Sequence, residues 1–347
     1  MNSEDGISEV SVEVRDSFGV TSDPNMPFLR WALDPSEAEI ALNQHLQPLA
    51  DGSGRLRLHA IHVVRYKRGR RCLVEYNIEA QDMDAGAGKI ALLGKARARG
   101  LDETTYEVVK SLWHSGWGGD NSDGIRVPEP VGILPEFQMW LQRKIPGIST
   151  TQLLLQSGGI EVARRVAEAI HKLHQANTHT NRVHTMADEL QILRDYLSRV
   201  AAVMPQWTRR IDNLLVACER LGASVSEPEP TGIHRDFYPD QVLVDGPAVY
   251  LLDLDLYCKG DPALDIGNFI GHIREMSLRT FNDVHALSDR EDALKQRFIE
   301  LSGCDHYRIQ VYATLTVARH IFLSTQFLDR RDYTEALLEE CERTLHL

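Results

Sequence analysis

Acidic and amide side chains gather in one stretch of the chain, residues 231–268. Two short apolar runs inside this stretch are rich in Val, Leu and Tyr and are separated by Asp245-Gly246-Pro247, which predicts two strands joined by a tight turn. Such a hairpin brings the residues before its first strand next to those at the end of its second. The polar residues at these two places are Asp236, Gln241, Asp253 and Asp255.

These side chains predict a site for a hard divalent cation. Carboxylates that lie close together repel one another unless a cation lies among them. Carboxylate and amide oxygens, without nearby cysteine or histidine pairs, suit Mg²⁺ better than Zn²⁺. We therefore expect the hairpin to bind Mg²⁺.

Three motifs in this region carry a resemblance to a known family. They are His234-Arg235-Asp236 followed by Gln241, then Leu252-Asp253-Leu254-Asp255, then Gly260-Asp261-Pro262-Ala263-Leu264-Asp265. In this order they resemble the core of the aminoglycoside phosphotransferase and choline kinase-like group. The resemblance implies an α+β, two-lobed protein-kinase-like fold, with a small antiparallel sheet in the N-lobe and a mainly helical C-lobe. It also implies an enzyme that transfers the terminal phosphate of ATP or GTP to an alcohol group of a small acceptor.

The resemblance assigns roles to the polar residues of the hairpin. Asp236 would orient the acceptor hydroxyl or accept its proton, although capping the turn before Pro239 is an alternative role. Asp253 would hold the Mg²⁺ that bridges the terminal phosphates, with Gln241 as the second ligand. Asp255 is either an extra metal ligand or an acceptor that supports the ligands.

Two neighbouring residues are expected to position this loop. His234 would orient it through a backbone hydrogen bond, and Asp265 would cap the following helix and tether the loop. Arg235 gives the His-Arg-Asp form found in protein kinases. The chain has no Gly-x-Gly-x-x-Gly loop and no Ala-Pro-Glu segment, which argues against a protein kinase.

Gln241 departs from the family pattern, which has Asn at this position. Glutamine carries the same amide oxygen on a side chain that is one methylene longer. It can still reach a metal if the backbone lies back by about 1–1.5 Å. The alternative is a weakened second metal site.

The first half of the chain predicts a sheet that binds nucleotide phosphates. Apolar runs on both sides of residues 66–71 predict a hairpin with a basic, glycine-containing tip. Arg70 and Arg71 at this tip are candidate phosphate ligands because guanidinium binds phosphate bidentately; a solvated basic turn is the alternative. A Gly/Ala linker over residues 84–88 then leads to an apolar strand over residues 89–97.

The resemblance places the lysine that holds the nucleotide phosphates on this strand. Lys95 matches it, with Lys89 as the competing candidate. The helix predicted over residues 102–115 carries Glu107, which by resemblance would pair with Lys95; Glu103 is the alternative partner.

The composition turns from strands to helices near residue 147. We expect a flexible N-terminus over residues 1–25, an N-lobe with the nucleotide-binding sheet over 26–143, and a helical C-lobe with the catalytic hairpin and acceptor site over 144–347. Residues 142–147 resemble the linker whose backbone receives the adenine ring. Helices are predicted from Asp34 and over Thr150–Gln156, Ile160–Gln175, Met186–Val203, Pro205–Leu221, Arg290–Leu301, Tyr307–Phe327 and Tyr333–His346.

Composition limits the class of protein and of partner. With 347 residues, 43% hydrophobic and 25% charged, the chain is typical of globular proteins. A net charge of −12 argues against nucleic acid as the main partner. No apolar run approaches the ~20 residues of a membrane span. An acidic N-terminus unlike a secretory leader and five scattered cysteines favour a cytoplasmic location.

The acceptor is not identified by any motif. An aminoglycoside, a sugar, choline or a related amino alcohol all fit the resemblance, and no residue pattern favours an oligomeric state. Gln241 and the basic loop motivate an alternative, a catalytically weakened nucleotide-binding or scaffolding protein. The acidic residues considered for the acceptor pocket, which also suit an ordinary helix surface, are Glu161, Asp188, Glu189 and Asp195.

Overall fold

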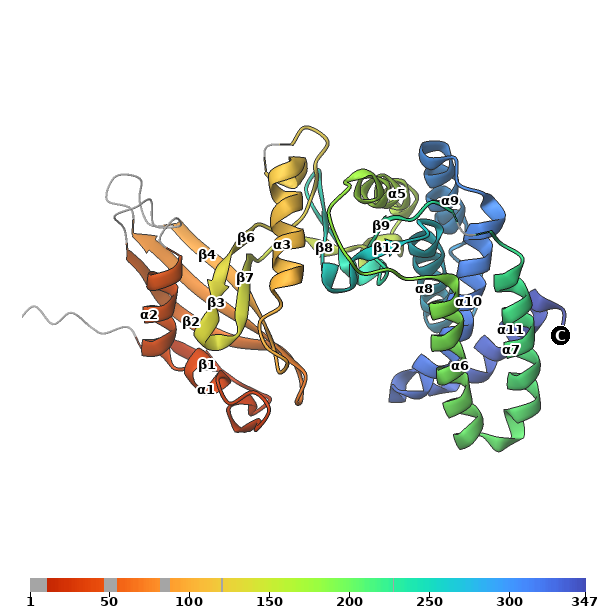
Figure 1. Cartoon of the computed structure of the whole chain (residues 1–347), viewed down its shortest axis with the longest axis horizontal. Coiled ribbons are helices and arrows are strands. Elements are labelled where there is room, and N and C mark those ends of the chain that lie inside the picture. The colour runs from red at the N-terminus through yellow and green to blue at the C-terminus, as the bar shows by residue number, and fades with distance from the viewer. Residues whose placement is uncertain (1–10, 47–54, 82–87, 120, 227) are drawn as a thin grey trace, which may run out of the picture. The chain divides into compact units, whose positions relative to one another are not determined.

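The computed structural model describes residues 11–46, 55–81, 88–119, 121–226 and 228–347. The chain folds into two compact units. The first unit is Met1–His114 with Pro128–Pro146, and the second is Ser115–Val127 with Gly147–Leu347. An antiparallel sheet dominates the first unit and helices dominate the second, so the expected α+β class is confirmed (Figure 1).

The first unit is built on one six-stranded sheet with strand order β1-β2-β3-β4-β7-β6. All neighbours are antiparallel except β1 and β2, which are parallel. The long β2–β3 hairpin is the one that the sequence predicts. Residues 82–87, most of the expected Gly/Ala linker, lie outside the described part of the chain. The strands are β1 (Glu13–Arg15), β2 (Arg55–Lys67), β3 (Arg71–Gln81), β4 (Gly88–Arg97), β6 (Pro130–Leu134) and β7 (Met139–Arg143).

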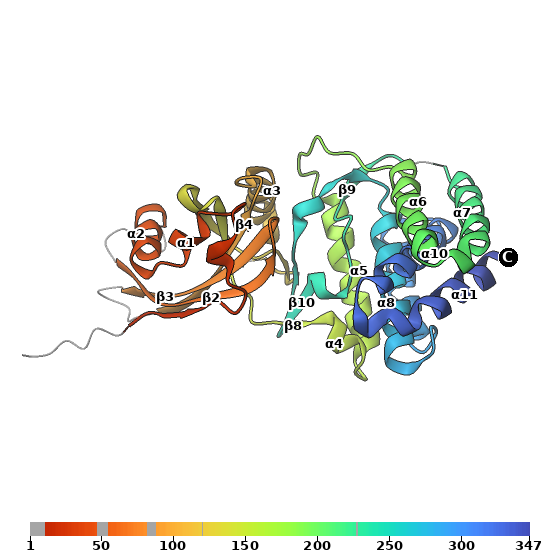
Figure 2. The same cartoon turned by 90° about the horizontal axis from the view of Figure 1, so that it is seen from below.

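One face of this sheet is covered by α1 (Leu29–Ala32) and α2 (Pro35–His45) (Figure 2). Alternate residues of β3 pack into the apolar core under these helices, because side chains of a strand alternate between its faces. Tyr76 belongs to this set and donates a hydrogen bond from its hydroxyl to the carbonyl of Ala32 (2.9 Å). The intervening residues of β3 face the opposite side of the sheet, and so does Lys95 of β4, which is paired with one of them, Leu73.

Helix α2 begins as the sequence predicts. The Asp34 carboxylate accepts hydrogen bonds from the backbone N–H groups of Ser36 and Glu37, and Pro35 occupies the first turn. On the other side of the unit, the Asp102 carboxylate caps α3 (Glu103–Leu112) through the N–H of Thr105. Short helical turns lie at Val20–Ser22 (η1) and Pro135–Phe137 (η4), and the turn at Trp113–Trp117 (η3) contains the point where the chain passes from the first unit to the second.

The expectation of a flexible N-terminus is wrong for residues 11–25. Residues 13–15 pair with β2, and Val20 is fully buried. Asp23, only 3% exposed, accepts hydrogen bonds from the Tyr66 hydroxyl and the Gly69 N–H, both at 2.7 Å, and from the Asn25 N–H at 2.9 Å. Isolated buried residues and polar tethers leave no periodic pattern, so the sequence did not predict this segment. Residues 1–10 lie outside the described chain.

The second unit contains two small sheets and a layer of helices. The four-stranded sheet has the order β5-β11-β10-β8, and β12 pairs with β9. The predicted catalytic hairpin is present as β10 and β11, and Gly246 in its turn has a φ of +55°, which favours glycine. The strands are β5 (Ile125–Arg126), β8 (Ile148–Ser149), β9 (Thr231–Ile233), β10 (Val242–Asp245), β11 (Ala248–Leu251) and β12 (Cys258–Gly260).

The predicted C-lobe helices are found close to their expected bounds. The helix expected after Asp265 is longer than its predicted core of residues 266–273. Among the described residues, no helix is long and apolar enough to cross a membrane. The helices are α4 (Thr150–Leu154), α5 (Gly159–Gln175), α6 (Met186–Val203), α7 (Thr208–Ala223), α8 (Ala263–Phe281), α9 (Ser288–Ser302), α10 (His306–Thr325) and α11 (Thr334–Leu345), with short turns η5 (Pro205–Trp207), η6 (Pro239–Gln241), η7 (Leu254–Leu256) and η8 (Leu328–Tyr333).

Helices α8 and α10 lie side by side in the middle of the helical layer (Figures 1 and 2). Two glycines of α8 allow this close approach. A Cβ at Gly267 would lie 2.3 Å from the Cβ of Tyr312, and one at Gly271 would lie 2.4 Å from the Cγ2 of Thr316. The two helices are thus closely packed, and the start of α8 lies next to the loop that precedes the catalytic hairpin.

The Asp23 tether generates a stability prediction. We expect Asp23→Ala to lower the free energy of unfolding by about 3 kcal/mol, because three hydrogen bonds to a buried carboxylate are lost. Urea denaturation measures this. Asp16→Ala is the matched control, since its carboxylate also accepts three N–H groups, but in an exposed turn; its loss should be about 1 kcal/mol. Equal losses in the two variants would contradict a buried anchor at residue 23.

Candidate active site

The loop between β9 and β10 is held by the buried carboxylate of Asp265, which is 0% exposed. Its two oxygens accept hydrogen bonds from the backbone N–H of His234 (2.9 Å) and of Arg235 (2.7 Å). His174 on α5 donates a third, from Nε2, at 2.8 Å. Charge-assisted bonds of this kind are stronger than neutral ones. The loop-tethering role expected for Asp265 is therefore present.

The capping role expected for Asp265 is wrong. Helix α8 begins at Ala263, and the backbone N–H of Ala263 donates to Asp261 Oδ1 at 2.9 Å. Asp265 lies within the first turn instead, where a carboxylate interacts favourably with the positive end of the helix dipole. Burial raises the pKa of Asp261, with its hydrogen bond to Ala263 and the nearby Arg308 acting in the opposite direction.

The backbone of Leu252 joins the loop to the end of the hairpin. Its carbonyl accepts a hydrogen bond from His234 Nε2 at 2.7 Å, and its N–H donates to the carbonyl of Gln241 at 2.8 Å. Because Leu252 immediately precedes Asp253, these two bonds connect three segments that carry candidate residues. His234 is fully buried and thus orients the loop as the sequence predicts.

Two non-glycine residues of the site adopt left-handed backbone conformations. The φ angles are +71° for Arg235 and +53° for Asp253. Such conformations are uncommon for residues other than glycine and tend to occur at functional sites. The carbonyl of Arg235 is held by the Asn268 side chain, whose Nδ2 donates to it at 2.7 Å.

Asn268 is in turn held by α10. Its Oδ1 accepts hydrogen bonds from the Thr316 hydroxyl (2.8 Å) and from the Arg319 guanidinium (2.7 Å). Sequence reasoning missed Asn268 and Arg319. One available signal was the spacing of Asn268 three residues after Asp265, which puts both on the same helix face.

Asp236 lies in this clamped loop and is half-buried. Within the described chain, its carboxylate forms no hydrogen bond or ion pair. The Gln241 side chain is 6% exposed and likewise has no hydrogen-bond partner among the described residues. Its backbone N–H closes the η6 turn onto the carbonyl of Tyr238 at 2.9 Å. These two side chains are thus held by their backbones and not by competing polar contacts.

Asp253 and Asp255 flank the start of η7 and are both half-buried. The carbonyl of Asp255 accepts a hydrogen bond from Arg182 at 2.8 Å, which fixes the backbone here. Among the described residues, no three His, Cys, Asp or Glu side chains are grouped to hold a metal ion. Mg²⁺ is commonly bound by one or two carboxylates together with substrate phosphates, and the donor set of Asp253, Asp255 and Gln241 fits that pattern.

In the first unit, Lys95 lies on the face of the sheet opposite α1 and α2. It is aligned with Leu73 on β3 and with Trp140 on β7, and its Nζ lies 5.1 Å from the centroid of the Trp140 ring. Arg70 is exposed in the turn of the β2–β3 hairpin, and Arg71 is half-buried at the start of β3.

Glu107 does not form the expected pair with Lys95. Its carboxylate lies 3.6 Å from Lys110 Nζ on its own helix, and its side chain is 64% exposed. The apolar face of α3 explains this orientation, because burial of Tyr106 and its helical neighbours turns Glu107 outward. Glu103, the alternative partner, is exposed as well.

The backbone expected to receive adenine is partly used by the sheet itself. The N–H of Arg143 donates to the carbonyl of Glu129 (2.9 Å), and the N–H of Lys144 donates to that of Ala91 (2.8 Å). The Lys144 side chain also pairs with the buried Glu75 at 2.7 Å. These two N–H groups are therefore engaged within the first unit.

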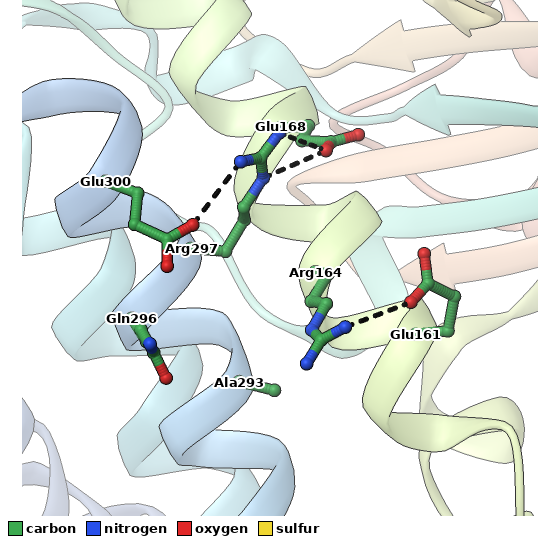
Figure 3. Close-up of a pocket in the computed structure, with 7 residues that line it drawn as sticks. All are labelled: Glu161, Arg164, Glu168, Ala293, Gln296, Arg297 and Glu300. Atoms are coloured by element: carbon green, nitrogen blue, oxygen red, sulfur yellow. Dashed lines mark hydrogen bonds and ion pairs between the residues drawn. The ribbon is translucent and has the colours of Figure 1, made fainter.

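A polar cavity of about 360 Å³ lies between α5 and α9 (Figure 3). Its charged side chains mainly neutralise one another: Arg297 contacts Glu168 at 2.8 Å, and Arg164 contacts Glu161 at 3.7 Å. None of the residues that the sequence predicts for catalysis or nucleotide binding lines it. The lining residues are Glu161, Arg164, Glu168, Ala293, Gln296, Arg297 and Glu300.

Comparison with solved structures identifies the fold. A spectinomycin phosphotransferase, solved with ADP and spectinomycin, has a TM-score of 0.56 and 13% identity, covering 88% of this chain and 94% of its own. A choline/ethanolamine kinase family protein from Mesorhizobium loti has a TM-score of 0.52 and 15% identity, and the match covers 92% of this chain and 93% of that protein. Choline kinase from Streptococcus pneumoniae has a TM-score of 0.54 and 12% identity, and the match covers 90% of this chain and 99% of that kinase. At such identities the likeness establishes the kinase-like fold alone.

Sequence comparison addresses the family directly. No curated protein matches the chain. The sequence model of the phosphotransferase enzyme family matches residues 121–295, which is 175 of 347 residues and includes the whole clamped hairpin. With half of the chain matched and the kinase-like fold in place, the chain belongs to the phosphotransferase enzyme family.

Proposed function

We propose that the chain is a kinase that transfers the terminal phosphate of ATP, or of GTP, to a hydroxyl of a small molecule. The observation that carries this proposal is the pair of hydrogen bonds made by the Leu252 backbone, which tie the loop of Asp236 to Gln241 and to Asp253. Phosphoryl transfer needs positioned groups and balanced charge more than covalent chemistry. A clamped loop with carboxylates on both sides suits that need.

In this proposal Asp236 orients the acceptor hydroxyl and accepts its proton. The alternative, that Asp236 caps the turn before Pro239, has little support, because the η6 turn is closed by backbone bonds onto Tyr238. The Asp236 carboxylate forms no hydrogen bond or ion pair within the described chain that would compete with an acceptor. Asp265 and Asn268 hold the backbone on the N-terminal side of this residue.

Asp253 and Gln241 would hold Mg²⁺, with Asp255 as a further ligand or as support for the other two. When bound, Mg²⁺ supplies positive charge that stabilises the phosphate oxygens. The Gln241 side chain forms no hydrogen bond within the described chain, so no protein contact competes with a bound ligand for its amide oxygen. Lys95, with Arg70 and Arg71 at the hairpin tip, would bind the nucleotide phosphates.

The role of Asp236 predicts a selective loss of turnover. A screen of hydroxylated metabolites for stimulated ATP consumption provides the assay. We expect Asp236→Asn to lower the stimulated rate by about 10²–10⁴-fold, the usual contribution of a general base. The affinity for ADP should stay within about twofold, because Asp236 is not assigned to the nucleotide.

Asp240→Asn is the matched control for this variant. Asp240 lies in the same loop, but its carboxylate is exposed and accepts hydrogen bonds from Ser149 (3.0 Å) and Thr151 (2.5 Å). Its turnover should match the unmodified chain. If Asp236→Asn also lost ADP binding, the base assignment would be wrong.

Metal binding predicts a second, separable effect. ADP should raise the melting temperature of the chain much more with Mg²⁺ than with EDTA, because the cation links the nucleotide to Asp253. Asp253→Asn should remove this difference, and Gln241→Leu should reduce it. Equal stabilisation by ADP with and without Mg²⁺, unchanged in Asp253→Asn, would favour the weakened nucleotide-binding or scaffolding protein over the kinase.

A further inference from the structure

A row of three packed aromatic rings begins two residues after Asp236, the proposed base. The ring of Tyr238, two residues after Asp236, stacks on His272 of α8 with centroids 4.7 Å apart and an interplanar angle of 19°. His272 in turn meets the edge of His320 on α10, with centroids 4.4 Å apart. The side-by-side packing of α8 and α10 thus places two histidines next to the catalytic loop (Figures 1 and 2).

Two arginines complete what we call the histidine–arginine cluster, defined as His272, His320, Arg279 and Arg330. Both arginines contact one carboxylate: Glu275 Oε1 lies 2.8 Å from Arg279 and 3.5 Å from Arg330. Two guanidinium groups against one carboxylate leave a positive charge at the cluster. Glu275 on α8 is its central acceptor and is buried.

Two nitrogen atoms of the cluster lack hydrogen-bond partners among the described residues, one on a histidine that can present an N–H there and one on an arginine. His320 is 1% exposed, and its Nε2 is buried without a hydrogen bond. The Nε of Arg330 is buried without one as well. Unsatisfied buried polar atoms cost free energy and call for a specific explanation. An anion bound at the cluster would accept hydrogen bonds from both.

The surroundings keep the two histidines neutral in the free protein. Burial, with the positive charges of Arg319, Arg330 and Arg279 acting in the same direction, lowers the pKa of His320 to about 3. Burial also lowers the pKa of His272, with His320 and the same arginines adding to the effect. Neutral histidine still offers one N–H donor, so the positive charge of the cluster comes from its arginines.

The acidic residues considered for a cationic acceptor are engaged elsewhere. Glu189 is buried between His184 (2.6 Å) and Arg319 (3.2 Å), and Asp188 forms a capping box with Thr185. The two others are exposed on helix surfaces, each beside a residue of its own helix: Asp195 with Gln191 and Glu161 with Arg164. Glu189 and Glu161 are therefore neutralised by arginines, while Asp188 and Asp195 lie exposed on a helix surface, so none of the four is a buried, unpaired carboxylate for an aminoglycoside or choline.

We propose that the histidine–arginine cluster binds an anionic group, a carboxylate or a phosphate, carried by the acceptor whose hydroxyl faces Asp236. This proposal rests on the proposed kinase function, which supplies the base at Asp236. Tyr238 lies two residues after Asp236 and stacks on His272, so the cluster lies close to the proposed base. The acceptor class is accordingly a hydroxylated compound that also carries a carboxylate or a phosphate, such as a sugar acid or a sugar phosphate.

The test measures binding of matched small molecules to the full chain saturated with MgADP. Glucose 6-phosphate and gluconate carry the two anions, glucose is the neutral control, and choline and kanamycin are the cationic ones. We expect the anionic compounds to bind more tightly than glucose by about tenfold or more, the contribution of a hydrogen bond to a charged group. Comparison of the phosphate with the carboxylate identifies which anion the acceptor carries.

Variants locate the binding to the cluster. Arg330→Gln removes a guanidinium, and His272→Phe keeps the ring stacked on Tyr238 while removing its nitrogens. Both should lower the affinity for the anionic compound by about tenfold. Arg199→Gln is the control, because Arg199 lies on α6 and contacts Phe322 outside the cluster. Circular dichroism confirms that each variant is folded.

The proposal is overturned if the cationic compounds bind in preference, if neither anion binds more tightly than glucose, or if Arg330→Gln and Arg199→Gln behave alike. Failure of the proposed kinase function has a different signature, the loss of Mg²⁺-dependent ADP binding by the unmodified chain. In that event the titrations are repeated without nucleotide, so the cluster is still tested by its own variants.

Discussion

The active loop depends on the burial of one carboxylate. Asp265 is removed from water, which is costly for a charge unless every oxygen finds a donor. The donors are His174 and the backbone N–H groups of His234 and Arg235. These bonds hold the loop in the uncommon left-handed backbone conformation of Arg235, and the carboxylate in the first turn of α8 offsets the cost of that conformation.

Much of this site could be predicted because its signals are local. Strand-forming runs around Asp245-Gly246-Pro247 predict the hairpin, and the spacing of the three motifs predicts which side chains it carries. The support from α5 and α10 could not be predicted in the same way. His174 lies 91 residues from Asp265, and Arg319 lies 51 residues from Asn268. Contacts over such separations depend on helix packing, and a single sequence carries no periodic trace of them.

Two predictions for the first unit were wrong because they too concern contacts that depend on packing. The helix predicted over residues 102–115 is present as α3, but the family resemblance, and not the helical pattern, assigned Glu107 to Lys95. Packing of Tyr106 against Trp140, with ring centroids 6.0 Å apart, instead leaves Glu107 facing solvent beside Lys110. Asp23 illustrates the opposite failure, because a segment without periodicity supplies the anchor of the β2–β3 turn. Polar tethers of this kind are invisible to hydrophobic patterning.

Net charge and local charge give opposite expectations about the acceptor. A chain with a net charge of −12 attracts cations at long range, whereas recognition is decided by the groups that a ligand contacts. Three buried carboxylates around the loop already have protein partners. Asp265 is bonded to backbone N–H groups, Glu189 to His184, and Glu275 to two arginines. Buried carboxylates near the catalytic loop are thus already bonded to protein groups. The nitrogen donors of the histidine–arginine cluster remain in excess, which favours an anionic acceptor although the whole chain is acidic.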